Sequence, residues 1–385
     1  MASATLRKPP KNGSRTAFPN GSWEAKWREP GNDGKLVWRN KRGFATRREA
    51  LAYAKRIEAD IDRGEHVPSK LASTRFGDVA DQWLDAKHFD KERTKEGYAS
   101  LLGSQVPGWL KGTPVGKITN PMLQEWVKER VSAGVGAGTI RNAMRNVIKP
   151  ALDYGVATGL IRSNPALGVK LPRVQKEEQC FLSAEEVELL AEEVRGYELV
   201  VRFTAYTGLR AGEVVALQVK HLDLMRKTVH VKRSAMPVIG KGILYVPTKT
   251  YAQRVIPLPS FLVDPLAAYI AGRASDPEAF VFLSREGMAL HHGNFMARHF
   301  KPAVARLVER GELSRDKAGL RFHDLRHTAA ALMIETGAEP FDVMKRMGHS
   351  SITVTYDRYG HRFPDRDTVI TSGLEARHRR ATNGG

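Results

Sequence analysis

Five short segments, far apart in the chain, carry the residue types that can break and rejoin a phosphodiester without a metal ion. An arginine does not deprotonate near neutral pH and can hold the non-bridging oxygens of a phosphate by paired, charge-assisted hydrogen bonds. Histidine and lysine can move protons, and tyrosine can serve as a nucleophile. In chain order, the segments are Thr207–Glu213, Lys249, His323–Thr328, Met347–Ser351 and Tyr356–His361.

Two arginines, Arg210 and Arg326, are the candidates for holding a phosphate. Taken alone, an arginine after a Thr-Gly turn is a weak signal, since such a residue usually makes a surface ion pair. Glu213 follows Arg210 by three residues. A carboxylate beside the scissile phosphate would repel it. We therefore expect Glu213 to be a buried partner that fixes a guanidinium group, with no role in proton transfer.

The histidines near Arg326 could move protons or bind a metal. His323 and Arg326 are three residues apart, which places them on one helix face. His323 and His327 are four apart, as in a zinc pair, but Asp324 stands where the metalloprotease pattern requires glutamate. No third ligand is evident, so no metal site is expected. We expect His323 to exchange a proton with the tyrosine or to donate to the phosphate, and His327 to pack behind the site.

In identity, order and spacing, the five segments resemble the catalytic boxes of the tyrosine recombinase (phage integrase) family. The resemblance covers roughly residues 178 to 375. It implies that Arg210 and Arg326 clamp the scissile phosphate. It also implies that His349 bonds to that phosphate or to the leaving oxygen, although Met347 stands where the family usually has leucine.

Lys249 stands between two strand-like runs, Leu244–Pro247 and Arg254–Leu258, which predicts a hairpin with the lysine at its tip. A lone lysine in a turn is normally exposed and inert. The resemblance implies that Lys249 protonates the leaving 5′ oxygen, with a pKa lowered by desolvation against DNA. Lys241 and Arg254 are neighbouring alternatives for this role.

Two tyrosines compete for the role of nucleophile. The tyrosine of the family typically precedes a residue-His pair, and Tyr359 has His361 two positions later. Tyr356 lacks this feature and is expected to be a packing aromatic. A free phenol has a pKa of about 10, so roughly one in a thousand is ionised at pH 7. Attack by Tyr359 therefore needs a nearby base and cations that stabilise the developing charge.

The composition is that of a multidomain soluble protein with a polyanionic partner. The 385 residues favour two or three domains. The 61 Lys plus Arg exceed the 42 Asp plus Glu, for a formal net charge of +19, which favours a nucleic acid. A single cysteine, Cys180, excludes an internal disulfide and is expected to pack. No signal peptide or apolar span is evident, so the expected location is the host cytoplasm, with the nucleoid.

The predicted fold is mainly α, in three domains. Residues 1–70 predict a small β-sheet-plus-helix domain: a flexible arm to about residue 18, strands at Ser22–Arg28 and Lys35–Arg39, a third strand at Lys41–Ala45, and a helix capped by Thr46. This unit holds 16 Lys/Arg against 8 Asp/Glu. It resembles the arm-type DNA-binding domain of many integrases, although a packing subdomain with a solvated basic face would look the same.

The other two predicted domains are helical for most of their length. Residues 71–172 carry apolar stripes at helical spacing and resemble the core-binding domain of the family. Residues 178–378 predict a mostly α catalytic domain that begins with a capping box at Ser183. Strand-like runs, beginning with Thr228–Arg233, predict a small antiparallel sheet within it.

The resemblance implies a site-specific DNA recombinase that integrates or excises a phage or mobile element. Tyr359 would attack the phosphate, leave a 3′-phosphotyrosyl link, and be displaced by the 5′ hydroxyl of a partner duplex. Because the ester is conserved, no cofactor is needed. The implied partners are double-stranded DNA attachment sites, a homotetramer on DNA, a DNA-bending protein and a directionality factor. The rivals are a type IB topoisomerase-like enzyme and a DNA-binding regulator without catalysis.

Overall fold

The computed structural model describes residues 2–7, 22–30, 35–63, 66–90, 92–174, 179–238, 242–247, 253–364 and 367–382. The chain forms two compact units, residues 1–176 and 177–385. The boundaries of the three predicted domains stay predictions. Within the described ranges, no helix combines the length and the apolar character that crossing a membrane requires.

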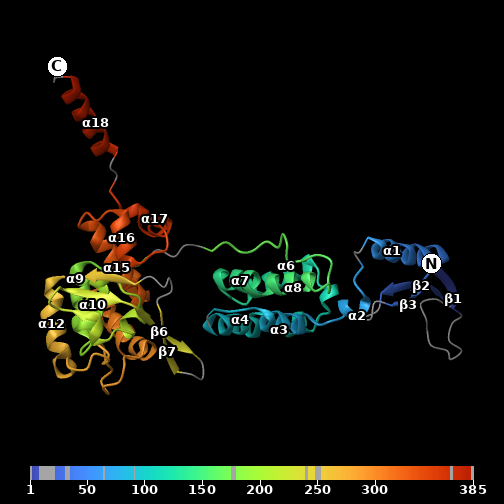
Figure 1. Cartoon of the computed structure of the whole chain (residues 1–385), viewed down its shortest axis with the longest axis horizontal. Coiled ribbons are helices and arrows are strands. Elements are labelled where there is room, and N and C mark those ends of the chain that lie inside the picture. Colours follow the sequence, from blue (N-terminus) through green and yellow to red (C-terminus); the bar gives the residue numbers. More distant parts are fainter. Residues whose placement is uncertain are drawn as a thin grey trace. The chain divides into compact units, whose positions relative to one another are not determined.

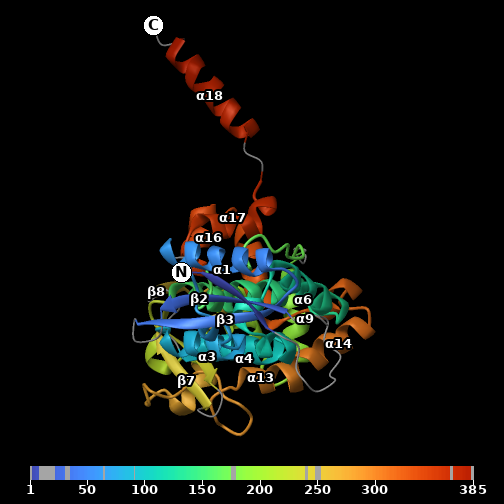
Figure 2. The same cartoon turned by 90° about the vertical axis from the view of Figure 1, so that its right-hand side faces the viewer.

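The first unit begins with a three-stranded antiparallel sheet in the order β1 (Ser3–Arg7), β2 (Ser22–Pro30) and β3 (Leu36–Phe44). One face of the sheet is covered by α1 (Arg47–Asp62) (Figures 1 and 2). The predicted capping box is confirmed, because the Thr46 hydroxyl accepts from the Glu49 amide and the Glu49 carboxylate accepts from the Thr46 amide. The core between sheet and helix includes Ala25, Trp27, Ala50 and Ala54.

Two predictions for this sheet were wrong. Residues 3–7, predicted to lie in the flexible arm, form β1. There the Arg7 Nε donates to the buried Glu24 carboxylate at 2.6 Å, so the strand gains an ion pair that its own sequence does not reveal. The predicted separate strand Lys41–Ala45 is the continuation of β3, because the strand pairs with β2 on both sides of a bulge, which lies between the Trp23–Phe44 and Ala25–Lys41 pairs.

The rest of the first unit is helical, as predicted. The apolar stripe beginning at Phe76 is buried, and so is the stripe beginning at Met122, except for Met122 itself, which is partly exposed. The stripe from Ile140 to Leu152 lies on one continuous helical stretch that passes through a π-helical segment, Met144–Ile148. The helices are α2 (Ser69–Ala72), α3 (Phe76–Ala86), α4 (Glu92–Gln105), α5 (Gly108–Gly112), α6 (Asn120–Ser132), α7 (Ala137–Ala143) and α8 (Lys149–Ala157).

Within its described residues, the second unit is mostly helical and has two small antiparallel sheets. The predicted capping box at Ser183 is confirmed, and Cys180 packs half-buried against the core of the unit. Its helices are α9 (Ala184–Glu193), α10 (Glu198–Thr207), α11 (Ala211–Val215), α12 (Ser260–Ile270), α13 (His292–Phe295), α14 (Lys301–Glu309), α15 (Phe322–Glu335), α16 (Pro340–Met347), α17 (Ile352–Tyr359) and α18 (Asp367–Thr382).

The pairing of the strands shows that the predicted hairpin around Lys249 was wrong. One sheet has the order β4 (Leu222–Asp223), β5 (Thr228–Val231), β8 (Arg254–Pro257), and the other pairs β6 (Arg233–Val238) with β7 (Gly242–Pro247). The predicted single strand Thr228–Arg233 is thus divided between β5 and β6. Since β7 pairs with β6 and β8 with β5, the strands that flank Lys249 are not partners. Lys249 and the alternative Lys241 lie outside the described residues.

Candidate active site

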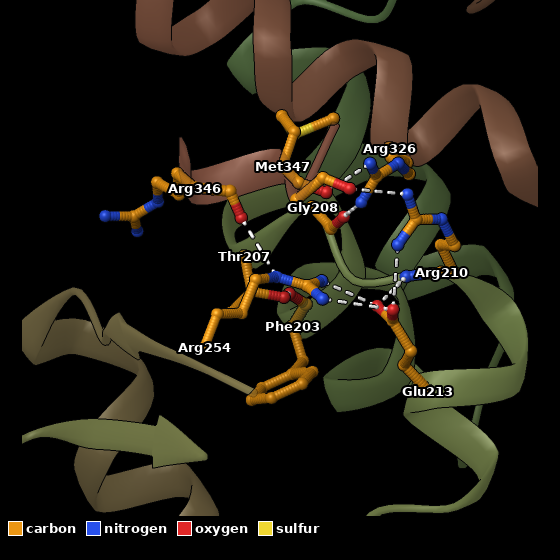
Figure 3. Close-up of polar contacts among 10 residues, drawn as sticks. Phe203, Thr207, Gly208, Arg210, Glu213, Arg254, Arg326, Arg346 and Met347 are labelled. Carbon is orange, nitrogen blue, oxygen red and sulfur yellow. Dashed lines mark hydrogen bonds and ion pairs between the residues drawn. The ribbon is translucent and has the colours of Figure 1, made fainter. Parts of the chain in front are cut away.

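Arg210 is positioned by a sharp turn between two helices. Helix α10 ends at Gly208, which adopts the left-handed conformation with φ of 71°. Arg210 then forms the N-cap of α11, where its backbone amide donates to the Glu213 Oε2 at 2.9 Å and its Nη1 donates to Oε1 at 2.9 Å (Figure 3). The Glu213 side chain is 2% exposed and that of Arg210 is 31% exposed. The carboxylate therefore holds a guanidinium group that still reaches solvent.

Arg326, on α15, is buried to 1% exposure. Its Nη1 donates to the Gly208 carbonyl and its Nη2 to the Met347 carbonyl (Figure 3). These bonds join α15 both to the turn that precedes Arg210 and to the end of α16. Burial, followed by the positive charge of Arg210, lowers the pKa of Arg326 to about 9, so the guanidinium group is still charged at neutral pH.

The C-terminal end of α16 is where the arginines of the site meet. The last turn of a helix leaves carbonyl groups without an internal partner and carries the negative end of the helix dipole, so it favours cations. Here consecutive carbonyls each accept from a different arginine: Arg346 from the Arg254 Nε at 3.2 Å, Met347 from the Arg326 Nη2, and Gly348 from the Arg210 Nη2 at 2.9 Å. No residue pattern predicts this arrangement, because any residue type carries a backbone carbonyl.

The phenol of Tyr359 is enclosed at the end of α17. The residue is 0% exposed, and its Oη lies 2.7 Å from the His327 Nδ1. Burial raises the pKa of Tyr359 to about 12, against the opposing positive charges of Arg326 and Arg358. The phenol is therefore protonated in this arrangement.

His327 was expected to pack behind the site, and its contact with the phenol was missed. Burial, followed by the nearby His323, lowers the pKa of His327 to about 4. The ring is then neutral at neutral pH, and its Nδ1 can accept the phenolic proton. The bond joins residues 32 positions apart, beyond the reach of a helical spacing rule.

The other two histidines flank this pair. The His349 ring stacks near the Tyr359 ring, with centroids 6.3 Å apart and planes at 12°, and its Nδ1 lies 2.9 Å from the Thr355 Oγ1. Its buried Nε2 has no hydrogen-bond partner within the part of the chain that the structure describes. His323 is solvent-exposed and meets the His327 ring edge-on, with centroids 4.9 Å apart. One imidazole nitrogen therefore stays available beside the phenol.

The structure thus brings most of the predicted site residues into one cluster. Some of these residues are in direct contact, and others are close enough for their charges to shift the pKa values of the histidines and the phenol. They are Arg210, Glu213, His323, Arg326, His349 and Tyr359. Arg254, which the sequence left open as an alternative to Lys249 for the role of proton donor, forms an ion pair with the Glu213 carboxylate at 2.6 Å. Tyr356 is 51% exposed and its ring lies 5.9 Å from that of Phe363.

Comparison with known proteins identifies relatives of the whole chain. Residues 180–366 match the model of the phage integrase family. The chain is 27% identical to the putative prophage phiRv2 integrase of Mycobacterium tuberculosis, over 97% of this chain and 98% of that protein. It is 22% identical to the ICEBs1 integrase of Bacillus subtilis, over 86% of this chain and 90% of the relative.

Solved structures share the fold. The Tn1549 transposon integrase, in complex with a circular intermediate DNA, superposes with a TM-score of 0.66 at 21% identity, over 79% of this chain and all (100%) of the other. A lambda integrase dimer bound to a core site superposes with a TM-score of 0.54 at 18% identity, over 92% of this chain and 97% of the other.

Proposed function

Because residues 180–366 make this chain a member of the phage integrase family, we propose that it is a site-specific DNA recombinase in which Tyr359 is the nucleophile. The observation that carries this function is the phenol of Tyr359 lying among histidines and arginines drawn from distant parts of the chain. The reaction integrates or excises the DNA of a phage or another mobile element.

The proposed reaction is a transesterification at phosphorus. The Tyr359 oxygen attacks the scissile phosphate, its proton passes to a neighbouring histidine, and the bond to the 5′ oxygen breaks to leave a 3′-phosphotyrosyl link. Arg210 and Arg326 stabilise the charge on the phosphorane, and one such donor contributes about 3–4 kcal/mol in a dry site. Lys249 protonates the leaving 5′ oxygen, and His349 forms a hydrogen bond with the phosphate or with that oxygen. The 5′ hydroxyl of a partner duplex reverses these steps, and since the ester is conserved, ATP is not required.

The function includes a conformational step. In this structure the phenol is 0% exposed and Arg326 is 1% exposed, so neither reaches a phosphate, whereas the Arg210 side chain is 31% exposed. We expect DNA to contact Arg210 first and α17 to move so that Tyr359 leaves His327.

The proposed partners follow from the chain and its structural neighbours. A lambda integrase tetramer has been solved on a Holliday junction. For this chain we propose double-stranded attachment sites and a homotetramer on DNA. The basic N-terminal sheet makes a second DNA contact, with which a DNA-bending protein and a directionality factor cooperate. The place of action is the cytoplasm of the host, at its nucleoid.

A nicked DNA half-site, which traps the covalent intermediate, tests the nucleophile. We expect a protein–DNA adduct with the wild type and with Tyr356→Phe, and none with Tyr359→Phe. An adduct that depends on Tyr356 would show that Tyr356, and not Tyr359, is the nucleophile. No adduct with the wild type would support the regulator without catalysis.

A second assay separates recombination from topoisomerase activity, which uses the same chemistry. We expect exchange between two attachment-site duplexes. Relaxation of supercoiled DNA without exchange between the sites would favour the type IB topoisomerase.

A further inference from the structure

Arg254, the first residue of β8, has all its guanidinium nitrogens engaged within the protein. Its Nη1 and Nη2 donate to the two oxygens of Glu213 at 3.1 and 2.6 Å, and its Nε donates to the Arg346 carbonyl at 3.2 Å (Figure 3). The side chain is 11% exposed. Three of its five N–H groups are thus used within the protein, and little of the side chain reaches solvent, which argues against the proton-donor role considered for Arg254 in the sequence.

Arg254 shares the Glu213 carboxylate with Arg210. Oε1 accepts from the Nη1 of each arginine, at 2.9 and 3.1 Å, and Oε2 accepts from the Arg254 Nη2 and the Arg210 amide, at 2.6 and 2.9 Å. Burial alone would raise the pKa of Glu213, but the hydrogen bonds and charge of Arg254, ahead of those of Arg210, lower it to about 2. Arg254 is therefore the main counter-ion of this buried carboxylate.

Arg254 also packs against the second partner of Arg210. Gly348 has φ of 63°, and a Cβ at this position would lie 3.1–3.2 Å from the Arg254 guanidinium and Cδ. The carbonyl of the same glycine accepts from the Arg210 Nη2 at 2.9 Å. Arg254 thus bonds to one of the two groups that hold the terminal nitrogens of Arg210 and packs against the other.

We propose that Arg254 is a positioning residue that acts through Glu213 and Gly348 to keep the Arg210 guanidinium facing the phosphate. It does not touch DNA itself. Lysine cannot replace it, because an ammonium group cannot present the planar fork that reaches both carboxylate oxygens while a third nitrogen reaches a carbonyl. This proposal rests on the proposed function.

The test is a double-mutant cycle on the nicked half-site, with the full-length protein. We expect Arg254→Lys to slow single-turnover adduct formation by about 10-fold or more while the Kd for the half-site changes by less than about 3-fold, since an interaction realised in the transition state affects rate more than binding. In an Arg210→Lys background, Arg254→Lys should slow the reaction by less than about 3-fold more, because residues that act as one unit are not additive.

Arg202→Lys is the matched control. Arg202 also pairs with a glutamate of the second unit, Glu188 at 2.5 Å, but it lies on α10 facing α9. We expect it to leave the rate of adduct formation unchanged. A general loss of folding would slow the reaction by the same factor in both Arg210 backgrounds, so the cycle separates it from positioning.

The outcomes are distinguishable. A wild type that forms no adduct overturns the proposed function and this inference with it. A wild type that forms the adduct while Arg254→Lys reacts at the same rate overturns this inference alone. So does an Arg254→Lys effect of equal size in both Arg210 backgrounds, since Arg254 would then act independently of Arg210.

Discussion

At the scale of single residues, the site depends on a carboxylate, Glu213, that is held between two guanidinium groups. A group whose folded pKa lies below its ordinary value stabilises the fold above that ordinary value and loses the effect as the pH falls. For Glu213 this stabilisation is lost as the pH falls from about 4.5 to about 2, the ordinary and the lowered pKa of the carboxyl group.

We expect Glu213→Gln to lower the free energy of unfolding by about 3 kcal/mol at pH 7, the size that a shift of this magnitude implies. The difference from the wild type should shrink as the pH falls from 4.5 toward 2, because the wild-type carboxyl is then protonated as well. Urea unfolding at a series of pH values measures it. A difference that stays constant over this range would mean that the charge of Glu213 is not the cause.

His327 and Tyr359 offer a second test at this scale, through their bond of 2.7 Å. We expect His327→Phe to destabilise the protein by about 1–3 kcal/mol, the cost of removing a hydrogen-bond partner from the buried phenol. In a Tyr359→Phe background, where no hydroxyl remains to be satisfied, the same change should cost less. Thermal unfolding of the four proteins gives the coupling, and additive effects would show that the hydrogen bond does not stabilise the fold.

At the scale of elements, the end of α16 and the turn between α10 and α11 organise the arginines. Gly208 belongs to this contact: its carbonyl accepts from Arg326, and a Cβ added to it would lie 2.7 Å from the Met347 Sδ. The close approach of Gly208 to the Met347 side chain therefore depends on the absence of a side chain at this position.

We expect Gly208→Ala to destabilise the protein and to slow adduct formation by about 10-fold or more, since misplacing catalytic groups by a fraction of an ångström has such effects. Gly159→Ala is the matched control: Gly159 has the same φ of 71° but open space around its Cα. It should show the backbone strain alone, about 1 kcal/mol, with an unchanged rate. Equal effects of the two substitutions on stability and rate would exclude the packing explanation.

At the scale of the whole molecule, the net charge of +19 suits a long polyanion. The N-terminal sheet also carries an exposed aromatic residue next to a positively charged one. Trp38 on β3 is 55% exposed, and the Arg28 guanidinium lies 4.7 Å from its ring centroid. Such a pair can contact both phosphates and bases.

We expect Trp38→Ala to weaken binding of the full-length protein to DNA that carries the distal, arm-type sites, and to leave adduct formation on a half-site unchanged. The loss should be about 1–3 kcal/mol if a base stacks on the ring. Fluorescence anisotropy with the two DNAs measures it. Trp109→Ala, at a tryptophan of the helical part that is 40% exposed, is the control, and a loss as large at that position would contradict a specific role for the sheet.

The sequence by itself determined the chemistry and the local elements. The five boxes predict the reacting groups, because catalysis of phosphoryl transfer by protein side chains draws on few residue types. The capping boxes at Thr46 and Ser183 predicted where helices begin, since the groups that satisfy the first amides lie within four residues of one another.

Only the tertiary structure decided which groups meet. The carbonyls of Arg346, Met347 and Gly348 hold three arginines, yet a backbone carbonyl is the same for every residue type and so carries no sequence signal. The strand β1 was missed, and the pairing of the strands flanking Lys249 was misjudged, for a related reason. Pairing depends on long-range hydrogen bonds and on ion pairs such as that of Arg7 with the buried Glu24, whose members are far apart in the chain.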